Sequence, residues 1–276
     1  SECALSGELK LPTITTHIGE LAFDYNQITK AVLPDSLKTI GSEAFRGCQL
    51  LQEVVFPEKL TTIGQYAFYD CIRLHTGTLK SKTPPEIFNQ TFNYTKTFYV
   101  PEGSGDVYSK SPNWSNLIVI NGNTPRKVTV TLTAAGTLGE EILKQVDYVT
   151  DVNELVINGP LNDDDFYQIK QRTTHLISID MTGATIESLP ESFFYERAAL
   201  LDIKLPATLK SIGRYAFYRC YGLTQITIPE GVTSIKDHSF EQCLSLKEIK
   251  LPTSLTEIQE YAFQDCKSLE NIEFPA

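Results

Sequence analysis

One unit of 23 residues repeats along most of this chain, and it constrains the fold more than any other feature. From Ile203 onward the unit occurs three times without a gap, as IKLPATLKSIGRYAFYRCYGLTQ, ITIPEGVTSIKDHSFEQCLSLKE and IKLPTSLTEIQEYAFQDCKSLEN. The same step separates Pro206, Pro229, Pro252 and Pro275, Phe217, Phe240 and Phe263, and Cys220, Cys243 and Cys266. One such unit cannot bury its apolar face alone, but stacked units share a continuous core, so the repeat predicts a solenoid.

The first half of the chain carries the same unit. The 23-residue step separates Pro34 from Pro57, Phe45 from Phe68, and Cys48 from Cys71. Cys3 precedes Pro12 by nine residues, as Cys243 precedes Pro252. Two positions depart from the pattern, because Asn26 and Arg197 stand where a Cys is expected. The sequence therefore predicts two repeat arrays.

The residue pattern inside one unit predicts its local structure. Ile249 and Leu251 alternate with polar residues, as in a short half-buried strand. Pro252 ends that strand, because proline cannot donate a hydrogen bond to a sheet. Tyr261-Ala-Phe263 with Cys266 and Leu269 has the three-to-four spacing of a helical turn. We therefore predict an α/β solenoid of parallel short strands and helical turns, with the Phe and Cys columns in its core.

The repeats flank a middle region that does not follow the 23-residue phase. We predict that residues 1–123 form one array with a C-terminal cap that includes Trp114. Residues 124–276 then begin with an N-terminal cap, at about 126–181, and continue as a second array. In that cap Asn162 precedes three aspartates, as an N-cap with acids in the first helical turn. Cys3 and Ala276 both lie partway through a unit, so we expect missing flanking sequence or self-association through uncapped ends.

Composition and charge exclude several classes of function. The net charge is −10 and the pI is about 5.0, which argues against binding the nucleic-acid backbone, because that needs clustered Lys and Arg. The sequence contains no run of 18 apolar residues that could span a membrane. Residues 1–123 have 10 basic and 12 acidic residues, whereas residues 124–276 have 14 and 22. If charge steers a partner, the second array should favour a basic one.

The unit LxxIxLPxxLxxIGxxAFxxCxx resembles the leucine-rich repeats of the BspA-like family, which are surface proteins of Bacteroidetes and some parasites. It is matched by Leu223-Thr-Gln-Ile-Thr-Ile-Pro229 and by Ile212-Gly213 through Phe217 to Cys220. Lys236 and Gln259 replace the glycine, so a positive φ is not strictly required there. The resemblance implies a leucine-rich-repeat solenoid, export to the cell surface and binding of host extracellular proteins. It implies no catalytic residues.

Neither the cysteines nor the histidines have the spacing of a reactive site. The repeat places the cysteines at equivalent inward positions, where small buried thiols fill the stack. A bridge between neighbouring coils is within reach but strained, and the paired cysteines of a zinc site are missing. His17, His75, His175 and His238 share no metal-ligand spacing. We therefore expect no enzyme activity, no metal and no cofactor. Asn89, Asn93 and Asn113 begin Asn-x-Ser/Thr triplets, which we expect to be unmodified in a bacterial chain.

The outward positions of the strands are the candidate ligand-binding residues. In the second array these positions are occupied by polar and charged side chains without aromatic rings, which argues against a carbohydrate-stacking groove and favours a protein-binding surface. A merely solvated face is an equally good interpretation. The candidate residues are Asp202, Lys204, Gln225, Thr227, Glu248, Lys250, Asn271 and Glu273. Tyrosines are enriched at interfaces, so a rival surface is formed by Tyr66, Tyr69, Tyr215, Tyr218 and Tyr221.

Two functions fit these features. The first is a non-enzymatic, adhesin-like protein, exported to the cell surface or lipid-anchored through N-terminal sequence not included here, which holds an extracellular or host protein on the solenoid face. The second is a structural spacer that displays another domain and has no ligand of its own. Charge reversal at Lys204, Glu248 and Lys250 should weaken binding in the first case only.

Overall fold

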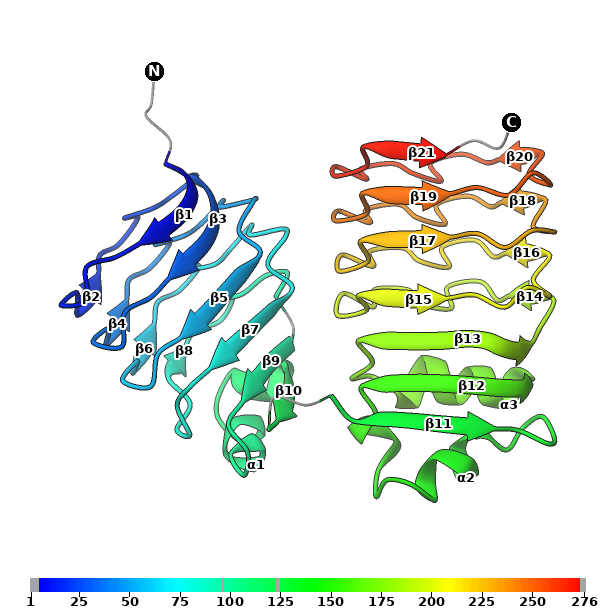
Figure 1. Ribbon diagram of the computed structural model, residues 1–276, viewed down its shortest axis with the longest axis horizontal. Helices are drawn as coiled ribbons and strands as arrows, with labels where there is room; N and C mark the ends of the chain where they lie inside the picture. Colours follow the sequence, from blue (N-terminus) through cyan, green and yellow to red (C-terminus); the bar gives the residue numbers. More distant parts are fainter. Residues whose placement is uncertain (1–4, 96, 123–124, 274–276) are drawn as a thin grey trace. The chain divides into compact units, whose positions relative to one another are not determined.

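The structure is a computed structural model that describes residues 5–95, 97–122 and 125–273. The chain divides into two compact units, unit 1 (Ser1–Thr124) and unit 2 (Pro125–Ala276). Each unit is a solenoid of short parallel strands closed by a small helical segment (Figure 1). Cys3 and Pro275, which belong to the repeat pattern, lie outside the described residues.

Unit 1 has two parallel sheets along its solenoid. The longer strands follow the order β1-β3-β5-β7-β9-β10, and the two-residue strands follow the order β2-β4-β6-β8. The repeat sets the register, so that Lys30 pairs with Glu53 and Thr39 with Thr62. The strands are β1 (Ser6–Lys10), β2 (His17–Ile18), β3 (Gln27–Val32), β4 (Thr39–Ile40), β5 (Glu53–Phe56), β6 (Thr62–Ile63), β7 (Thr76–Leu79), β8 (Glu86–Ile87), β9 (Thr97–Val100) and β10 (Ile118–Asn121).

Unit 2 repeats this plan, but its longer strands form two sheets. Their orders are β11-β12-β13-β15 and β17-β19-β21, while the short strands stay continuous as β14-β16-β18-β20. The strands are β11 (Lys127–Thr131), β12 (Glu154–Pro160), β13 (Ser178–Thr185), β14 (Ser188–Leu189), β15 (Asp202–Lys204), β16 (Ser211–Ile212), β17 (Gln225–Thr227), β18 (Ser234–Ile235), β19 (Glu248–Lys250), β20 (Glu257–Ile258) and β21 (Asn271–Glu273).

Helices occur only in the closing segments of the described chain. Unit 1 ends with α1 (Gly105–Ser109) and a 3₁₀ turn over Trp114–Asn116. Unit 2 begins with α2 (Leu138–Leu143), a 3₁₀ turn over Val149–Asp151, and α3 (Asp163–Tyr167), which continues into a π turn over Gln168–Arg172. Asn162 caps α3 as the sequence predicts. Asp165 does more than complement the helix dipole, because its buried carboxylate accepts the amides of Gly136 and Leu138.

The prediction of helical turns inside the repeats is wrong. That part of each coil is a chain of turns in which alternate amides point to the next coil, because bulky residues such as Tyr215 and Arg219 adopt left-handed φ values of 56° and 57°. The amides between them close turns on the residue three positions earlier. The bonds to the next coil run from Tyr215 to Asp237 (3.1 Å), from Phe217 to Ser239 (2.8 Å) and from Arg219 to Glu241 (3.0 Å). We call this third set of bonds the turn ladder.

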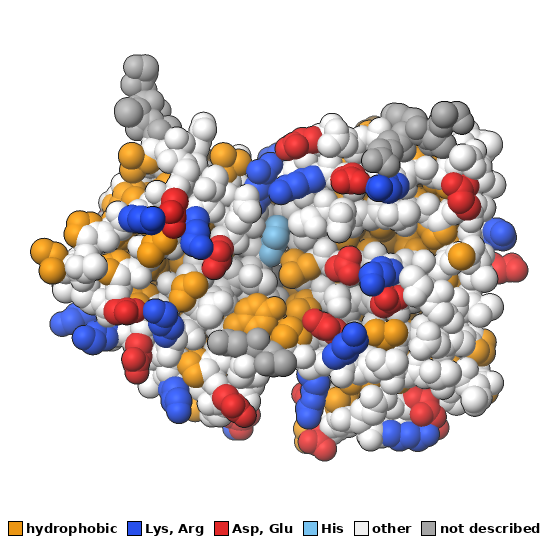
Figure 2. Space-filling view, in the orientation of Figure 1, with side chains coloured by type: hydrophobic (Ala, Val, Ile, Leu, Met, Phe, Trp, Pro, Cys, Tyr) orange, Lys and Arg blue, Asp and Glu red, His pale blue; other side chains and the backbone are white. Residues whose placement is uncertain are grey.

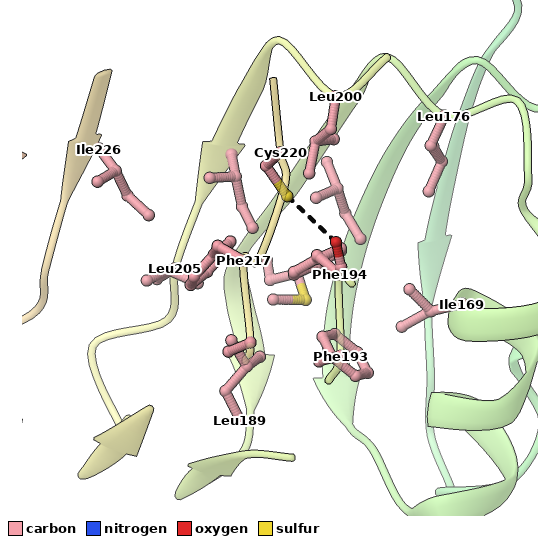
Figure 3. Close-up of a cluster of buried hydrophobic side chains, with 14 of the residues drawn as sticks. Ile169, Leu176, Leu189, Phe193, Phe194, Leu200, Leu205, Phe217, Cys220 and Ile226 are labelled. Atoms are coloured by element: carbon pink, nitrogen blue, oxygen red, sulfur yellow. Dashed lines mark hydrogen bonds between the residues drawn. The ribbon is translucent and has the colours of Figure 1, made fainter. Parts of the chain in front are cut away.

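The Phe and Cys columns lie in the core, as predicted. In unit 2 the rings of Phe194, Phe217, Phe240 and Phe263 stack with centroid separations of 5.5, 4.8 and 5.4 Å. Each described cysteine thiol donates a hydrogen bond to the carbonyl of the Phe in the preceding coil, as Cys220 does to Phe194 at 3.1 Å (Figure 3). The five described cysteines are all free thiols. The columns therefore join neighbouring coils by both stacking and hydrogen bonds.

Arg197 replaces the cysteine where unit 2 passes from its cap to its first coil. No Phe carbonyl precedes this coil, and the end of the α3 segment lies there instead, with carbonyl groups that need donors. The Arg197 guanidinium donates to the carbonyls of Thr173 (2.7 Å), Ile169 (2.6 Å) and Lys170 (2.9 Å). Burial is the main cause of its lowered pKa. A residue with several donors is therefore needed where a thiol offers one.

Candidate functional site

The eight predicted site residues lie on the outer strands of unit 2. Asp202 and Lys204 belong to β15, Gln225 and Thr227 to β17, and Glu248 and Lys250 to β19. The sheet pairing places Gln225 beside Glu248, and Thr227 beside Lys250. Asn271 and Glu273 occupy the same positions on β21, where they pair with Glu248 and Lys250. In Figure 2, acidic, basic and apolar side chains are mixed over these strands.

The sheet that carries these residues is interrupted between β15 and β17. The two strands are neighbours, but the hydrogen-bonded order ends at β15 and begins again at β17. The Leu201 amide donates to Ile177, and the Lys247 amide donates to Thr224. Among the described residues, no corresponding bond joins Thr224 to Leu201. The short strands and the turn ladder stay continuous through the same coils, so the interruption is local to the outer face.

A groove of about 750 Å³ opens at this interruption. It brings together six of the eight predicted residues, and Asn271 is not among its lining residues. Ile203 and Ile226 also line it but are buried in the core, so Ala207 and Pro229 supply its accessible apolar floor. The remaining lining residues are Thr182, Leu205 and Glu230. The outward face is therefore a hollow with an apolar floor and a charged rim rather than a flat polar sheet.

Ion pairs offset part of the charge at this rim. Lys204 lies 3.2 Å from Asp180, and Lys250 lies 3.8 Å from Glu248. Burial acts to raise the pKa of Asp180, but hydrogen bonds from Thr182 and the Lys204 ammonium outweigh it and lower that pKa. The hydrogen bond to Asp180 raises the pKa of Lys204. Asp202 and Glu230 leave an excess of negative charge in the groove lining.

Sequence reasoning missed Leu201, which precedes β15. The following coils have the polar residues Thr224, Lys247 and Glu270 at this position. The Leu201 side chain lies against the next coil, since a methyl group added to Gly222 would stand 2.9 Å from its Cδ2. An aliphatic residue at a polar repeat position, followed by a glycine in the next coil, is the sequence signal for the interruption.

The rival tyrosine surface consists mostly of rings that pack on one another. Tyr215 stacks on His238 with a centroid separation of 4.6 Å, and His238 stacks on Tyr261 at 5.0 Å. Tyr218 stacks on Tyr195 at 4.9 Å. In unit 1, Tyr66 packs edge-on against Tyr69 at 5.5 Å. Tyr221 is half-buried. Packing between turns therefore accounts for these rings better than a binding surface does.

The buried thiols are poorly suited to redox or nucleophilic chemistry. Burial raises the pKa of Cys48 to about 11 and the pKa of Cys220 and Cys266 to about 12. These side chains are therefore protonated at neutral pH, and they are unreactive because the thiolate is the reactive form of cysteine. The described residues contain no group of three or more His, Cys, Asp and Glu that could hold a metal ion.

The comparisons with known proteins point to one repeat family. A family model described as BspA type leucine rich repeat region matches residues 2–112 and 172–276, in six copies. No curated protein matches the chain. Among the helices that the structure describes, none combines the length and apolar character needed to cross a bilayer.

Several solved structures are similar to this chain. A leucine rich cell surface protein from Faecalibacterium prausnitzii is 24% identical over 99% of this chain and 60% of its own length, with a TM-score of 0.33. A leucine-rich repeat protein from Bacteroides ovatus is 22% identical over 96% of this chain and 78% of that chain, with a TM-score of 0.38. The T. pallidum leucine rich repeat protein is 18% identical over 78% of this chain and 77% of that one, with a TM-score of 0.27.

Proposed function

Because the chain belongs to the BspA-type leucine-rich repeat family, we propose that it is a non-enzymatic, adhesin-like binding protein that holds an extracellular protein on the outer face of unit 2. The proposal includes export to the cell surface. The observation that carries it is the groove between β15 and β17, which gathers six outward-facing polar and charged residues around accessible apolar residues.

The interruption gives this groove what a docked protein segment needs. Strand edges without sheet partners present backbone donors and acceptors for a partner chain. Ala207 and Pro229 provide accessible apolar area in the lining, and burial of apolar area is the main favourable contribution to most protein association. Charged side chains at the rim fix orientation and exclude unsuitable partners. An apolar centre within a polar rim is the usual anatomy of a protein interface.

Charge favours a basic partner. Residues 124–276 have 14 basic and 22 acidic residues, and the groove lining has more acidic than basic side chains. An acidic surface of this kind raises the rate at which a basic partner associates, and salt weakens the effect. We therefore expect the partner segment to contain Lys or Arg beside an apolar residue.

The test is a binding screen of the whole chain against immobilised matrix and plasma proteins at two salt concentrations. Glu248→Lys reverses an acidic charge at the groove, and Glu260→Lys makes the same change at an exposed site outside the groove lining. We expect a saturable interaction that Glu248→Lys weakens at least tenfold, because a basic partner then meets a less acidic groove, and that Glu260→Lys preserves. Equal binding by both variants would exclude the groove as the contact surface.

A spacer function is the second candidate. The ion pairs of Lys204 with Asp180 and of Lys250 with Glu248 favour it, because they neutralise charge within the face itself. A chain that is folded, as shown by a cooperative thermal transition, yet binds no protein in the screen would support this function over the first.

A further inference from the structure

A second pocket lies in unit 1, where the last coil meets the C-terminal cap. Its volume is about 270 Å³, near the lower end of the range for small-molecule sites. We propose that this pocket binds one ring of a neutral saccharide. It belongs to a different unit from the β15–β17 groove, so the two proposals stand or fall separately. Its lining is Tyr69, Ile87, Phe88, Asn89, Gln90, Thr91, Phe92, Asn93, Asn113, Asn116 and Leu117.

A tight turn after β8 forms one wall of the pocket. Thr91 fixes this turn, because its amide donates to the Phe88 carbonyl and its hydroxyl accepts the Phe88 amide at 2.9 Å. The same hydroxyl donates to the Gly64 carbonyl at 3.0 Å, and Thr91 is buried. Gln90 has a left-handed φ of 62°. The side chains of Phe88, Asn89 and Gln90 therefore extend from a turn that is held in one shape.

The 3₁₀ turn of the cap forms the opposite wall, and it is fixed too. The Asn113 side-chain amide donates to the Ile87 carbonyl of β8 at 2.7 Å, and Asn113 has a left-handed φ of 64°. The buried indole of Trp114 donates to the Pro85 carbonyl at 2.8 Å. These bonds tie the cap to the last short strand and set the position of Asn116. A preorganised site loses less conformational entropy when a ligand binds.

The turn ladder ends at this pocket, because no further coil follows to accept the ladder amides of the last coil. In an earlier coil, the amides of Glu43 and Phe45 donate to Gln65 and Ala67. The equivalent amides here belong to Gln90 and Phe92, and among the described residues neither has a hydrogen-bond partner. Both residues line the pocket. Backbone donors are therefore available to a ligand oxygen in addition to the side-chain amides.

The lining chemistry selects an uncharged, polyhydroxylated ligand. Five of the lining residues carry carboxamides, each with a donor group and an acceptor oxygen, which match hydroxyl groups that both donate and accept. None of the residues that line the pocket is charged, so no Lys or Arg is present to recognise a phosphate or carboxylate. Phe88 is 41% exposed and offers an aromatic face for the apolar C–H face of a sugar ring.

The test uses the whole chain on an array of neutral, sialylated and sulfated glycans, followed by titration of a neutral hit. Asn side-chain amide signals in ¹⁵N NMR spectra give a direct readout. We expect binding to neutral glycans, perturbed side-chain amides of Asn89, Asn93 and Asn116, and at least a tenfold loss in Phe88→Ala and in Asn116→Ala. Neither substituted side chain has a described hydrogen bond, so both variants should fold.

Matched controls separate this site from general surface effects. Tyr148→Ala removes an aromatic ring that is 69% exposed in unit 2, and Asn271→Ala removes an exposed carboxamide there. Both should leave glycan affinity unchanged, as should Lys250→Glu at the groove. Failure of every neutral glycan to bind the folded chain overturns the proposal. So does a glycan hit that Phe88→Ala and Asn116→Ala leave intact, or capture of sulfated glycans alone.

Discussion

The two units are built from the same coil but closed at opposite ends, and the difference shows that the solenoid is polar. In the turn ladder every inter-coil amide points to the later coil and every carbonyl to the earlier one. The cap of unit 2 precedes its array, so it meets carbonyl groups, and Lys170 donates to the Glu191 carbonyl at 3.2 Å. The cap of unit 1 follows its array, so it meets amides, those of Gln90 and Phe92 among them.

This polarity means that the two caps meet different backbone groups. In unit 2, carbonyl groups at the junction of cap and array are bound by cationic side chains. Lys170 of the cap donates to the first coil, and Arg197 of that coil donates back to the α3 segment. The cap of unit 1 lies at the amide end of the ladder, but its side chains donate to other carbonyls, Asn113 to Ile87 and Trp114 to Pro85, and no partner for the amides of Gln90 and Phe92 is found among the described residues. The two ends of the ladder therefore differ: in unit 2 Lys170 of the cap meets a ladder carbonyl, and in unit 1 a polar pocket lies beside the unmatched amides.

The largest effect should come from the Phe columns, which the two units share. Phe240→Ala and Phe68→Ala each remove a fully buried ring, and we expect each to cost about 3–5 kcal/mol of unfolding free energy. Phe68 should lie at the upper end, because it contacts Phe56 and Phe92 as well as Phe45. Urea unfolding followed by circular dichroism measures both. A urea midpoint equal to that of the wild type would show that these rings do not contribute to the core.

A single substitution towards the repeat consensus should cost more stability in unit 2 than in unit 1. Arg197→Cys removes the guanidinium donor from three carbonyls of the α3 segment, of which Ile169 keeps the Thr173 hydroxyl, and we expect a loss of about 2–3 kcal/mol. Asn26→Cys removes the acceptor of the Leu5 amide in a half-buried place, and we expect a loss below about 1.5 kcal/mol.

Urea unfolding of the two consensus variants gives the comparison, and Arg172→Met, which alters an exposed arginine nearby, is the control. Equal costs for Arg197→Cys and Asn26→Cys would show that the cap of unit 2 does not depend on the guanidinium.

The buried thiols should make both units less stable in alkali. Burial raises the pKa of Cys71 and of Cys243 well above the usual value, so their stabilising contribution is complete below the unfolded pKa near 8.5 and is lost as the pH rises towards the folded pKa. When the pH rises from 8 to 10, we expect each of these thiols to lower the unfolding free energy by about 2 kcal/mol. Cys71→Ala and Cys243→Ala should each remove the contribution of the thiol that is replaced.

The chain contains a single tryptophan, Trp114, which is buried in unit 1. Tryptophan fluorescence therefore reports the unfolding of unit 1 and measures the effect of Cys71→Ala. Circular dichroism measures the effect of Cys243→Ala in unit 2. A pH dependence that neither variant reduces would contradict the assignment to these thiols.

The fold could be read from the sequence because the repeat fixes the phase of every buried position. The Phe and Cys columns and the capping role of Asn162 follow from spacing and local rules. The turn conformation could not be predicted, since the left-handed positions carry Tyr215 and Arg219, which avoid that region in general. Gly213 has no positive φ and serves a close approach instead, because an added methyl group would stand 2.7 Å from the Glu191 amide nitrogen.

The candidate site was only partly predictable for a related reason. Alternation along each strand identifies the outward residues, and six of them line one surface groove. The groove itself depends on a missing strand pairing between coils, which the alternation inside a coil does not encode. The pocket of unit 1 depends on where the turn ladder ends, and that follows from three-dimensional packing between the last coil and the cap.

The smallest effect should come from the outer-face ion pairs, which the two units share. Lys30 lies 3.3 Å from Glu53 in unit 1, and Lys204 lies 3.2 Å from Asp180 in unit 2. Exposed pairs are screened by water and salt, so Lys30→Met and Lys204→Met should leave the urea midpoint unchanged within error at physiological salt. A difference could arise only in unit 2, because Asp180 is the more buried acid. A loss of stability in Lys204→Met that disappears in 1 M salt would show that the β15–β17 groove needs this pair to hold its shape, whereas an equal loss in both variants would contradict that difference between the units.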